Sequence, residues 1–114
     1  MWDIRPVSWL KPARKVFDTF PDDVRREVAR ALSLAAEGRK ADIAKPMVGL
    51  GSGVLEIAVR FRGDAWRVVY AVQIGDDVWV VHAFQKKSKS GIATPRHEID
   101  VIRARLRALK EMLP

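Results

Sequence analysis

The sequence predicts an α+β fold with the element order β-α-α-β-β-β-α, in which a twisted antiparallel sheet packs against helices. Two observations support this. Three segments of strand character follow one another in the middle of the chain with only short turns between them. Apolar residues recur at helical spacing on both sides of these segments. At 114 residues the chain fits one domain, which is expected to span residues 1–114.

The first third of the chain predicts one short strand and two helices. The segment Asp3–Trp9 contains Pro6, which cannot donate a ladder hydrogen bond, so this strand is expected at a sheet edge. A helix is expected over Lys11–Thr19, and Pro21 closes it and opens a second helix. Gly38 is expected to end that second helix. Its apolar stripe consists of Val24, Val28, Leu32 and Ala35.

The centre of the chain predicts a loop and then a three-stranded meander. Residues 39–53 are expected to connect the parts, and the glycine-rich run at 49–53 favours a tight turn over a phosphate loop because GxxxxGK[ST] is absent. Apolar and polar residues alternate over Val54–Phe61. A second strand is expected over Trp66–Val72. The run Val78–Phe84 is almost continuously apolar, which predicts a central strand.

The end of the chain predicts a basic loop and a long helix. Residues 85–93 carry three lysines and a glycine. Thr94 is expected to be the N-cap and Pro95 the first residue of a helix that runs over Pro95–Met112. The apolar stripe of this helix consists of Ile99, Ile102, Leu106, Leu109 and Leu113.

The composition is strongly basic, which narrows the classes of partner. The chain has 21 lysine and arginine residues against 14 acidic ones and a net charge of +7, so it attracts polyanions. Nucleic acid, the ribosome and an acidic protein are all candidates, and a solvated basic surface is the alternative. The chain lacks cysteine, which excludes disulfides and thiolate metal sites and fits a reducing cytoplasm.

Several other classes of function lose support from the same sequence. No apolar run reaches the length of a membrane span, and the first residues lack the apolar run of a signal peptide, so we expect a cytoplasmic protein without a membrane partner. His82 and His97 are the two histidines and have no metal-binding spacing, so neither a metal nor a cofactor is expected. For His82, a satisfied, partly buried histidine is favoured over a catalytic one.

Cationic side chains gather near the ends of the predicted strands. Arg60 and Arg62 end the first strand of the meander, and Lys86, Lys87 and Lys89 follow the third. If these strands are neighbours, the cations meet at one edge of the sheet.

Arg67 lies inside an apolar strand, where an arginine costs desolvation unless it is paired or reaches a ligand. An ion pair with Glu56 or Asp64 and a functional contact are equally compatible with the pattern.

Such a cluster suits cleavage of RNA without a metal. The 2′-OH of RNA can attack the adjacent phosphate, and guanidinium and ammonium groups can stabilise the charge that develops there. A lysine with a lowered pKa could also serve as an acid or base. Because DNA offers no 2′-OH, this route is specific to RNA. A module that binds phosphates without cutting them remains equally compatible with the composition.

The segment from Pro46 to Leu106 resembles a known family. The stretches GVLEIAVRFRGDAWRVVYAV and VWVVHAFQKKSKSGIATPRHEID are similar to the phage-derived HigB-like branch of the RelE/ParE toxin superfamily. The shared features, in order, are a strand ending at Arg60, the run Trp66-Arg67-Val68 with Tyr70, the run from His82 to Lys87, and Thr94-Pro95. The ordered set is more specific than any single piece and covers more than half of the chain.

The resemblance implies a RelE-like fold and a type II toxin that cleaves mRNA on the ribosome and is neutralised by an antitoxin, usually of helix-turn-helix type. Carried over by position, it implies catalytic roles for Arg60, Arg67, Lys86 and Lys87. Contacts with RNA or the ribosome are expected from Arg62, Lys89, Arg96, Arg103 and Arg107. The alternatives are a ParE-like gyrase inhibitor and a phage protein that only binds nucleic acid.

The chain departs from the family pattern where the general base is concerned. RelE has lysines on the strand before Arg60, where this chain has Glu56 and Ala58. It also has a late tyrosine, whereas Tyr70 is the single tyrosine here and belongs either to the site or to the core. The general base is therefore unassigned; Glu56, Tyr70 and His82 are the candidates, and an ion pair with an arginine is the alternative for Glu56.

Overall fold

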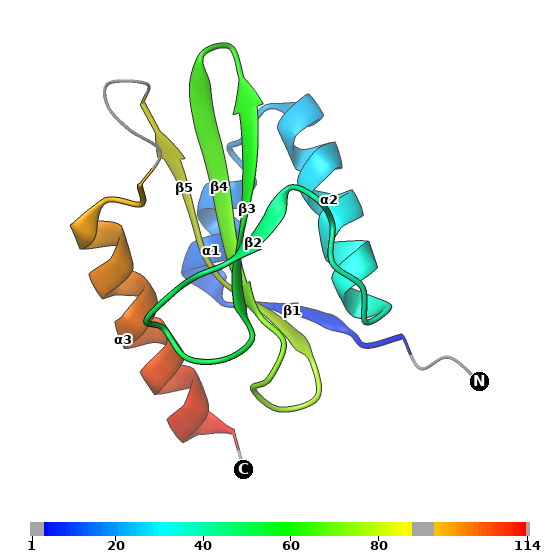
Figure 1. Cartoon of the computed structure of the whole chain (residues 1–114), viewed down its shortest axis with the longest axis vertical. Coiled ribbons are helices and arrows are strands. Elements are labelled where there is room, and N and C mark those ends of the chain that lie inside the picture. The colour runs from blue at the N-terminus through cyan, green and yellow to red at the C-terminus, as the bar shows by residue number, and fades with distance from the viewer. Residues whose placement is uncertain (1–3, 88–92, 114) are drawn as a thin grey trace.

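The fold is the predicted α+β arrangement, with a five-stranded sheet and three helices in the part described (Figure 1). The computed structural model describes residues 4–87 and 93–113. The elements are β1 (Val7–Trp9), α1 (Lys11–Phe17), α2 (Asp22–Ala36), β2 (Ala44–Pro46), β3 (Val54–Phe61), β4 (Asp64–Ala71), β5 (Val78–Lys86) and α3 (Arg96–Met112).

The sheet is mixed, because one edge strand runs parallel to its neighbour. The strand order is β1-β5-β4-β3-β2, and the neighbours from β2 to β5 pair antiparallel. β1 pairs parallel with β5, so the predicted antiparallel sheet gains one parallel pair at this edge. The predicted edge position of the first strand and the interior position of β5 are confirmed. Pro6, which lacks an N–H, accepts a hydrogen bond from the amide of Val78 through its carbonyl.

The strand β2 lies inside the segment that was expected to be a loop. Its three residues pair with Leu55, Glu56 and Ile57 of β3 and form the other edge of the sheet. A three-residue strand that ends in Pro46 is too short to show a period of two in the sequence, which is why the loop prediction over 39–53 was wrong here.

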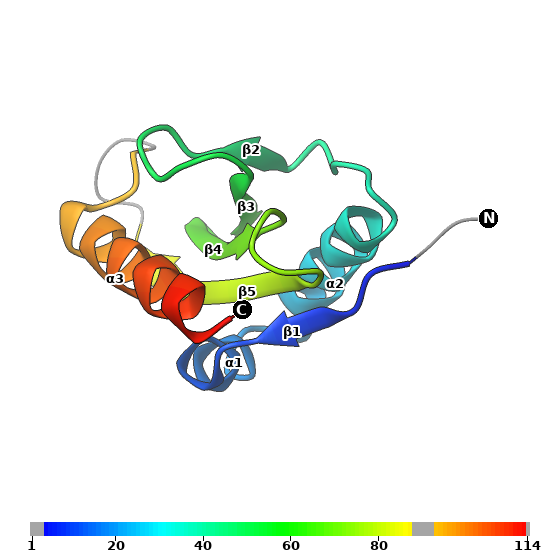
Figure 2. The same ribbon diagram turned by 90° about the horizontal axis from the view of Figure 1, so that it is seen from below.

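Two apolar clusters cover the two faces of the sheet. The first lies between the sheet and helices α1 and α2, and includes the predicted stripe of α2 packed against Ile57, Val59 and Val68. The second lies under α3, where Ile102, Leu106 and Leu109 are buried. Figure 2 shows α2 and α3 on opposite sides of the sheet. Among the described residues, α3 packs mainly against β5, so its face of the sheet is less covered next to β2 and β3.

A β-bulge decides which face the end of β5 presents. Val69 lies opposite His82 and Tyr70 opposite Val80, so Val81 is the extra residue in β5. Val80 belongs to the first cluster, whereas His82 shares the α3 face with its partner Val69. Val80 and His82 would share a face in a regular strand, because they are two residues apart, but the bulge places them on opposite faces of the sheet.

The predicted element boundaries differ from the structure by a few residues. Pro21 and Pro95 occupy N-cap positions rather than first-turn positions, and β4 begins at Asp64 instead of Trp66. Gly38 follows α2 with a φ of 81°, as expected for its role at the helix end. Within the described residues, no helix combines the length and apolar character needed to cross a bilayer.

Candidate functional site

The open part of the α3 face forms a cavity of about 380 Å³. Its lining residues come from β2, β3 and β4 and the segment before β2, and they are Asp42, Ile43, Lys45, Glu56, Ala58, Arg60, Ala65 and Arg67. Ala58 and Ala65 are the small side chains of this lining and lie among charged neighbours. Arg60, Lys45 and Ala58 are exposed.

Cross-strand pairing explains why these residues meet. Arg60 of β3, Ala65 of β4 and Lys86 of β5 form one row across the sheet, so Arg60 and Lys86 flank the same alanine. The next row holds Arg67, opposite Ala58. The structure thus brings together three of the four cations assigned to catalysis.

Arg67 is buried and bound to a carboxylate. Its Nη1 atom donates hydrogen bonds to Glu56 Oε1 at 3.3 Å and to Thr94 Oγ1 at 3.2 Å. The side chains of Arg67 and Glu56 are only 7% and 14% exposed. The ion pair with Glu56, one of the two readings of the sequence, is therefore present in the fold.

Glu56 is held from two sides and is the site's strongest candidate for proton transfer. Thr94 Oγ1 donates a hydrogen bond to Glu56 Oε2 at 2.9 Å, while Arg67 engages Oε1. Burial raises the pKa of Glu56 above its ordinary value, and the charge of Arg67 and the hydrogen bond from Thr94 oppose that rise. A carboxylate with a raised pKa at the wall of an open cavity is suited to accept a proton at neutral pH.

His82 lies in a separate network under α3 and does not line the cavity. Its Nε2 atom is 2.6 Å from Glu98 Oε1, and Arg105 Nη1 is 2.9 Å from Nδ1. An arginine can only donate, so Nδ1 accepts and Nε2 carries the proton of a neutral ring. Burial lowers the pKa of His82, which favours the same neutral form. These contacts support the satisfied, partly buried histidine rather than a catalytic one.

Two other candidates lie away from the cavity. Tyr70 is 1% exposed and packs in the first apolar cluster, on the opposite face of the sheet, which supports its interpretation as a core residue. Lys87 extends toward Asp64, with Nζ 3.9 Å from Oδ2, and the same carboxylate accepts a hydrogen bond from Gln85. The expected convergence of Lys87 with Arg60 is thus not seen, because alternate residues at the end of β5 face opposite sides.

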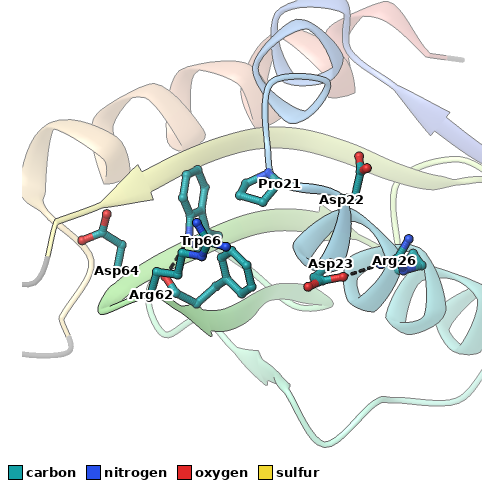
Figure 3. A pocket seen from close by; sticks show the side chains of 8 residues that line it. Pro21, Asp22, Asp23, Arg26, Arg62, Asp64 and Trp66 are labelled. Carbon is teal, nitrogen blue, oxygen red and sulfur yellow. Dashed lines mark hydrogen bonds and ion pairs between the residues drawn. The ribbon is translucent and has the colours of Figure 1, made fainter.

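Asp64 lines a second cavity, of about 510 Å³, at the start of α2 and the β3–β4 hairpin (Figure 3). Arg62 also lines this cavity, at the hairpin tip, where its φ is 54° and its guanidinium lies over the ring of Phe61. Trp66 forms part of the wall and donates a hydrogen bond to the carbonyl of Phe61. Arg62 is therefore exposed near the site but outside the cavity of Glu56.

The basic residues of α3 are exposed on its outer surface. Arg96 Nε lies 3.7 Å from Asp100 Oδ1, and Arg103 donates a hydrogen bond to the carbonyl of Gly49. The side chain of Arg107 is also exposed. Lys89 lies outside the described residues.

Sequence reasoning missed two members of the site. Lys45 lies on β2, which shows no strand pattern, and it reaches the cavity because it pairs with Glu56 in the register. Thr94 was expected to cap α3, but Pro95 is the N-cap and no side chain caps this helix. In the part of the chain that the structure describes, no three histidine, aspartate or glutamate side chains are placed to hold a metal ion.

Comparison with known proteins identifies the family of the chain. A model of the family described as phage-derived protein Gp49-like (DUF891) matches residues 15–107, from within α1 into α3. This family is RelE/ParE-like and is associated with the toxins of toxin–antitoxin systems. Searches of curated proteins and of solved structures gave no significant match. Because the family match spans most of the chain, this protein belongs to the phage-derived Gp49-like family of RelE/ParE-like toxins.

Proposed function

We propose that this chain is the toxin of a type II toxin–antitoxin pair, of the HigB-like branch, and that it cleaves mRNA on the ribosome without a metal. One observation carries the proposal. A carboxylate with a raised pKa, Glu56, stands at the wall of an open cavity whose exposed walls carry the cations Lys45 and Arg60. This combination offers a proton acceptor beside groups that attract a phosphate.

The chemistry follows from the positions of these groups. Glu56 takes the proton of a ribose 2′-OH, whose oxygen attacks the adjacent phosphorus. The bond from phosphorus to the 5′ oxygen breaks and leaves a 2′,3′-cyclic phosphate. Arg60 and Lys86, on either side of Ala65, stabilise the extra negative charge of the phosphorane. The leaving 5′ oxygen takes a proton from a lysine at the cavity, for which Lys45 is our choice.

Arg67 receives a different role from the one implied by the resemblance. Arg67 is 5% exposed as a residue and its guanidinium is bound to Glu56 and Thr94, so we assign it to holding Glu56 rather than to contacting the phosphate. The cavity remains cationic nevertheless, because in the region described no carboxylate pairs with Arg60 or Lys45.

The wider surface fits the same proposal. Arg62 and the outer arginines of α3, Arg96, Arg103 and Arg107, are exposed and suited to contact RNA or the ribosome. The proposed partners are therefore mRNA and the ribosome in the cytoplasm, together with a neutralising antitoxin. We propose that this antitoxin is a helix-turn-helix protein encoded next to the toxin.

The test is induction of the chain in a sensitive bacterial host, followed by primer extension on cellular mRNA. We expect growth arrest with discrete cuts that disappear when translation initiation is blocked. Glu56→Gln should lower the cleavage rate about 100-fold or more, as loss of a general base does. Arg60→Ala should lower it about 10- to 100-fold, as expected for a charge-assisted contact.

Arg30→Ala is the matched control, since Arg30 is exposed on α2, which covers the opposite face of the sheet. It should behave like the wild type. DNA damage without mRNA cuts would replace our proposal with gyrase inhibition. RNA binding without cuts and without arrest would replace it with a binding module. If a folded Glu56→Gln variant cleaved mRNA at the wild-type rate, Glu56 would not be the general base.

A further inference from the structure

Thr94 does not do what its place before a helix predicts. It precedes Pro95, the N-cap of α3, and its side chain makes no capping hydrogen bond. Instead, its hydroxyl reaches Glu56, 38 residues away in the sequence. A half-buried hydroxyl that leaves its own helix end uncapped and binds a carboxylate at the cavity wall calls for a functional explanation.

The three side chains form a closed triangle. Arg67 Nη1 donates to Glu56 Oε1 at 3.3 Å and to Thr94 Oγ1 at 3.2 Å, and Thr94 Oγ1 donates to Glu56 Oε2 at 2.9 Å. An arginine can only donate hydrogen bonds, so the threonine hydroxyl must accept one from Arg67 and donate its own hydrogen bond to the carboxylate. Each oxygen of Glu56 therefore has one fixed donor and keeps acceptor capacity for a ligand.

We propose that Thr94 is a positioning residue, which together with Arg67 locks the Glu56 carboxylate at the cavity wall in the orientation that accepts the proton of the attacking hydroxyl. This inference rests on the proposed function, because it presupposes that Glu56 is the base. Thr94 does not line the cavity that would hold the RNA, and its contact with the proposed chemistry is the hydrogen bond to the Glu56 carboxylate. It acts through Glu56 alone.

The charged groups around Glu56 determine how its pKa should change when Thr94 is replaced. The charged and titratable groups that face it are Lys45 on β2, Arg60 on β3, Arg67 on β4, Asp42 before β2, and the neutral His82 with Glu98 in the network beneath α3. Burial raises the pKa of Glu56, whereas Arg67 and the hydrogen bond from Thr94 lower it. Loss of the hydroxyl should therefore raise the pKa of Glu56 further.

The experiment compares Thr94→Val, which keeps the shape of the side chain without its hydroxyl, with Thr94→Ser, which keeps the hydroxyl. The readout is single-turnover cleavage of mRNA on purified ribosomes as a function of pH. Thr94→Val should cleave about 10-fold more slowly at neutral pH, with the acidic limb of its profile displaced upward by about one pH unit. Thr94→Ser should restore both. Thr19→Val, at an exposed threonine at the end of α1, is the matched control and should leave both unchanged.

A second measurement does not depend on activity. Carboxyl-carbon NMR of Glu56 in the free protein should show a higher pKa in Thr94→Val than in the wild type or in Thr94→Ser. If Thr94→Val does not fold, Thr94→Ala takes its place in both measurements. A folded variant without the hydroxyl that keeps the wild-type rate, profile and Glu56 titration overturns this inference.

The two proposals fail in different ways. If the wild type does not cleave mRNA, or if Glu56→Gln cleaves normally, the proposed function fails. If Glu56→Gln is inactive while Thr94→Val matches the wild type, only the positioning role of Thr94 fails.

Discussion

Removal of the charge of Arg67 should cost stability as well as activity, and the cost should depend on pH. In the folded chain the side chains of Arg67 and Glu56 are 7% and 14% exposed and form an ion pair. The attraction between the two charges offsets the loss of their hydration. Arg67→Met keeps most of the volume but leaves a buried carboxylate without its cation. We expect a loss of about 3 kcal/mol, the lower end of the range for breaking a buried pair, because Glu56 keeps Thr94 and the cavity beside it.

This loss is large for a chain of this size. Domains are stable by only about 5–15 kcal/mol, so about 3 kcal/mol lowers the midpoint of thermal unfolding by roughly 10 °C. Inactivity of an arginine variant in a growth assay would therefore not separate catalysis from folding. The assay is urea unfolding of the wild type, Arg67→Met, Glu56→Gln and the double variant, which isolates the coupling between the two side chains. We expect a coupling of about 2–3 kcal/mol at neutral pH.

The sign of the pH dependence follows from Glu56. Burial raises its pKa in the folded state above the ordinary value of 4.5, so between these two values the folded chain binds the proton that the unfolded chain has lost. The wild type therefore loses stability as the pH rises through this window. Without Arg67 the pKa of Glu56 rises further, so the cost of Arg67→Met should be small in acid, where Glu56 is neutral, and complete at neutral pH. Additive single variants, or a cost independent of pH, would refute the reasoning.

Two further predictions concern residues that the structure places outside the cavity. Burial lowers the pKa of His82 below 6.5, so its contribution to stability is present above this pH and is lost as the pH falls through the folded pKa. Urea unfolding at a series of pH values should show this loss of stability in the wild type and in Arg30→Ala, an exposed control on α2. In His82→Gln the free energy of unfolding should depend less on pH, and an unchanged pH dependence in this variant would contradict the prediction. Tyr70→Phe should keep growth arrest and mRNA cleavage, because Tyr70 is a core side chain on the face of the sheet opposite the cavity. A Tyr70→Phe variant that folds but does not cleave mRNA would show that the hydroxyl of Tyr70 takes part in the reaction.

Local pattern was sufficient for the elements with a clear period. The stripes of α2 and α3 were visible at helical spacing, and the structure buries Val24, Val28 and Leu32 of α2 and Ile102 and Leu106 of α3. The bounds of β3 follow from its alternation, since one of its faces is apolar and the other carries the charged side chains. Each of these patterns records which face is buried, and burial is the strongest constraint on local sequence.

Tertiary pairing decided the features that carry no local period. The parallel contact of β1 with β5, the short strand β2 and the bulge at Val81 each depend on a partner far away in the sequence. The bulge alone places His82 on the α3 face, where Glu98 and Arg105 bind it. A strand of three residues, or a single inserted residue, leaves no signal that a pattern can show.

The sequence by itself determined that the chain is basic, lacks cysteine, and carries arginines near the ends of its central strands. It left open whether Arg67 meets an internal carboxylate or a ligand, and it suggested Thr94 as a helix cap. Only the tertiary structure joined Arg67, Glu56 and Thr94, because the contact needs β3, β4 and the start of α3 in register. Charge is a property of composition, whereas the environment that sets the pKa of a carboxylate is made by residues that the fold brings together.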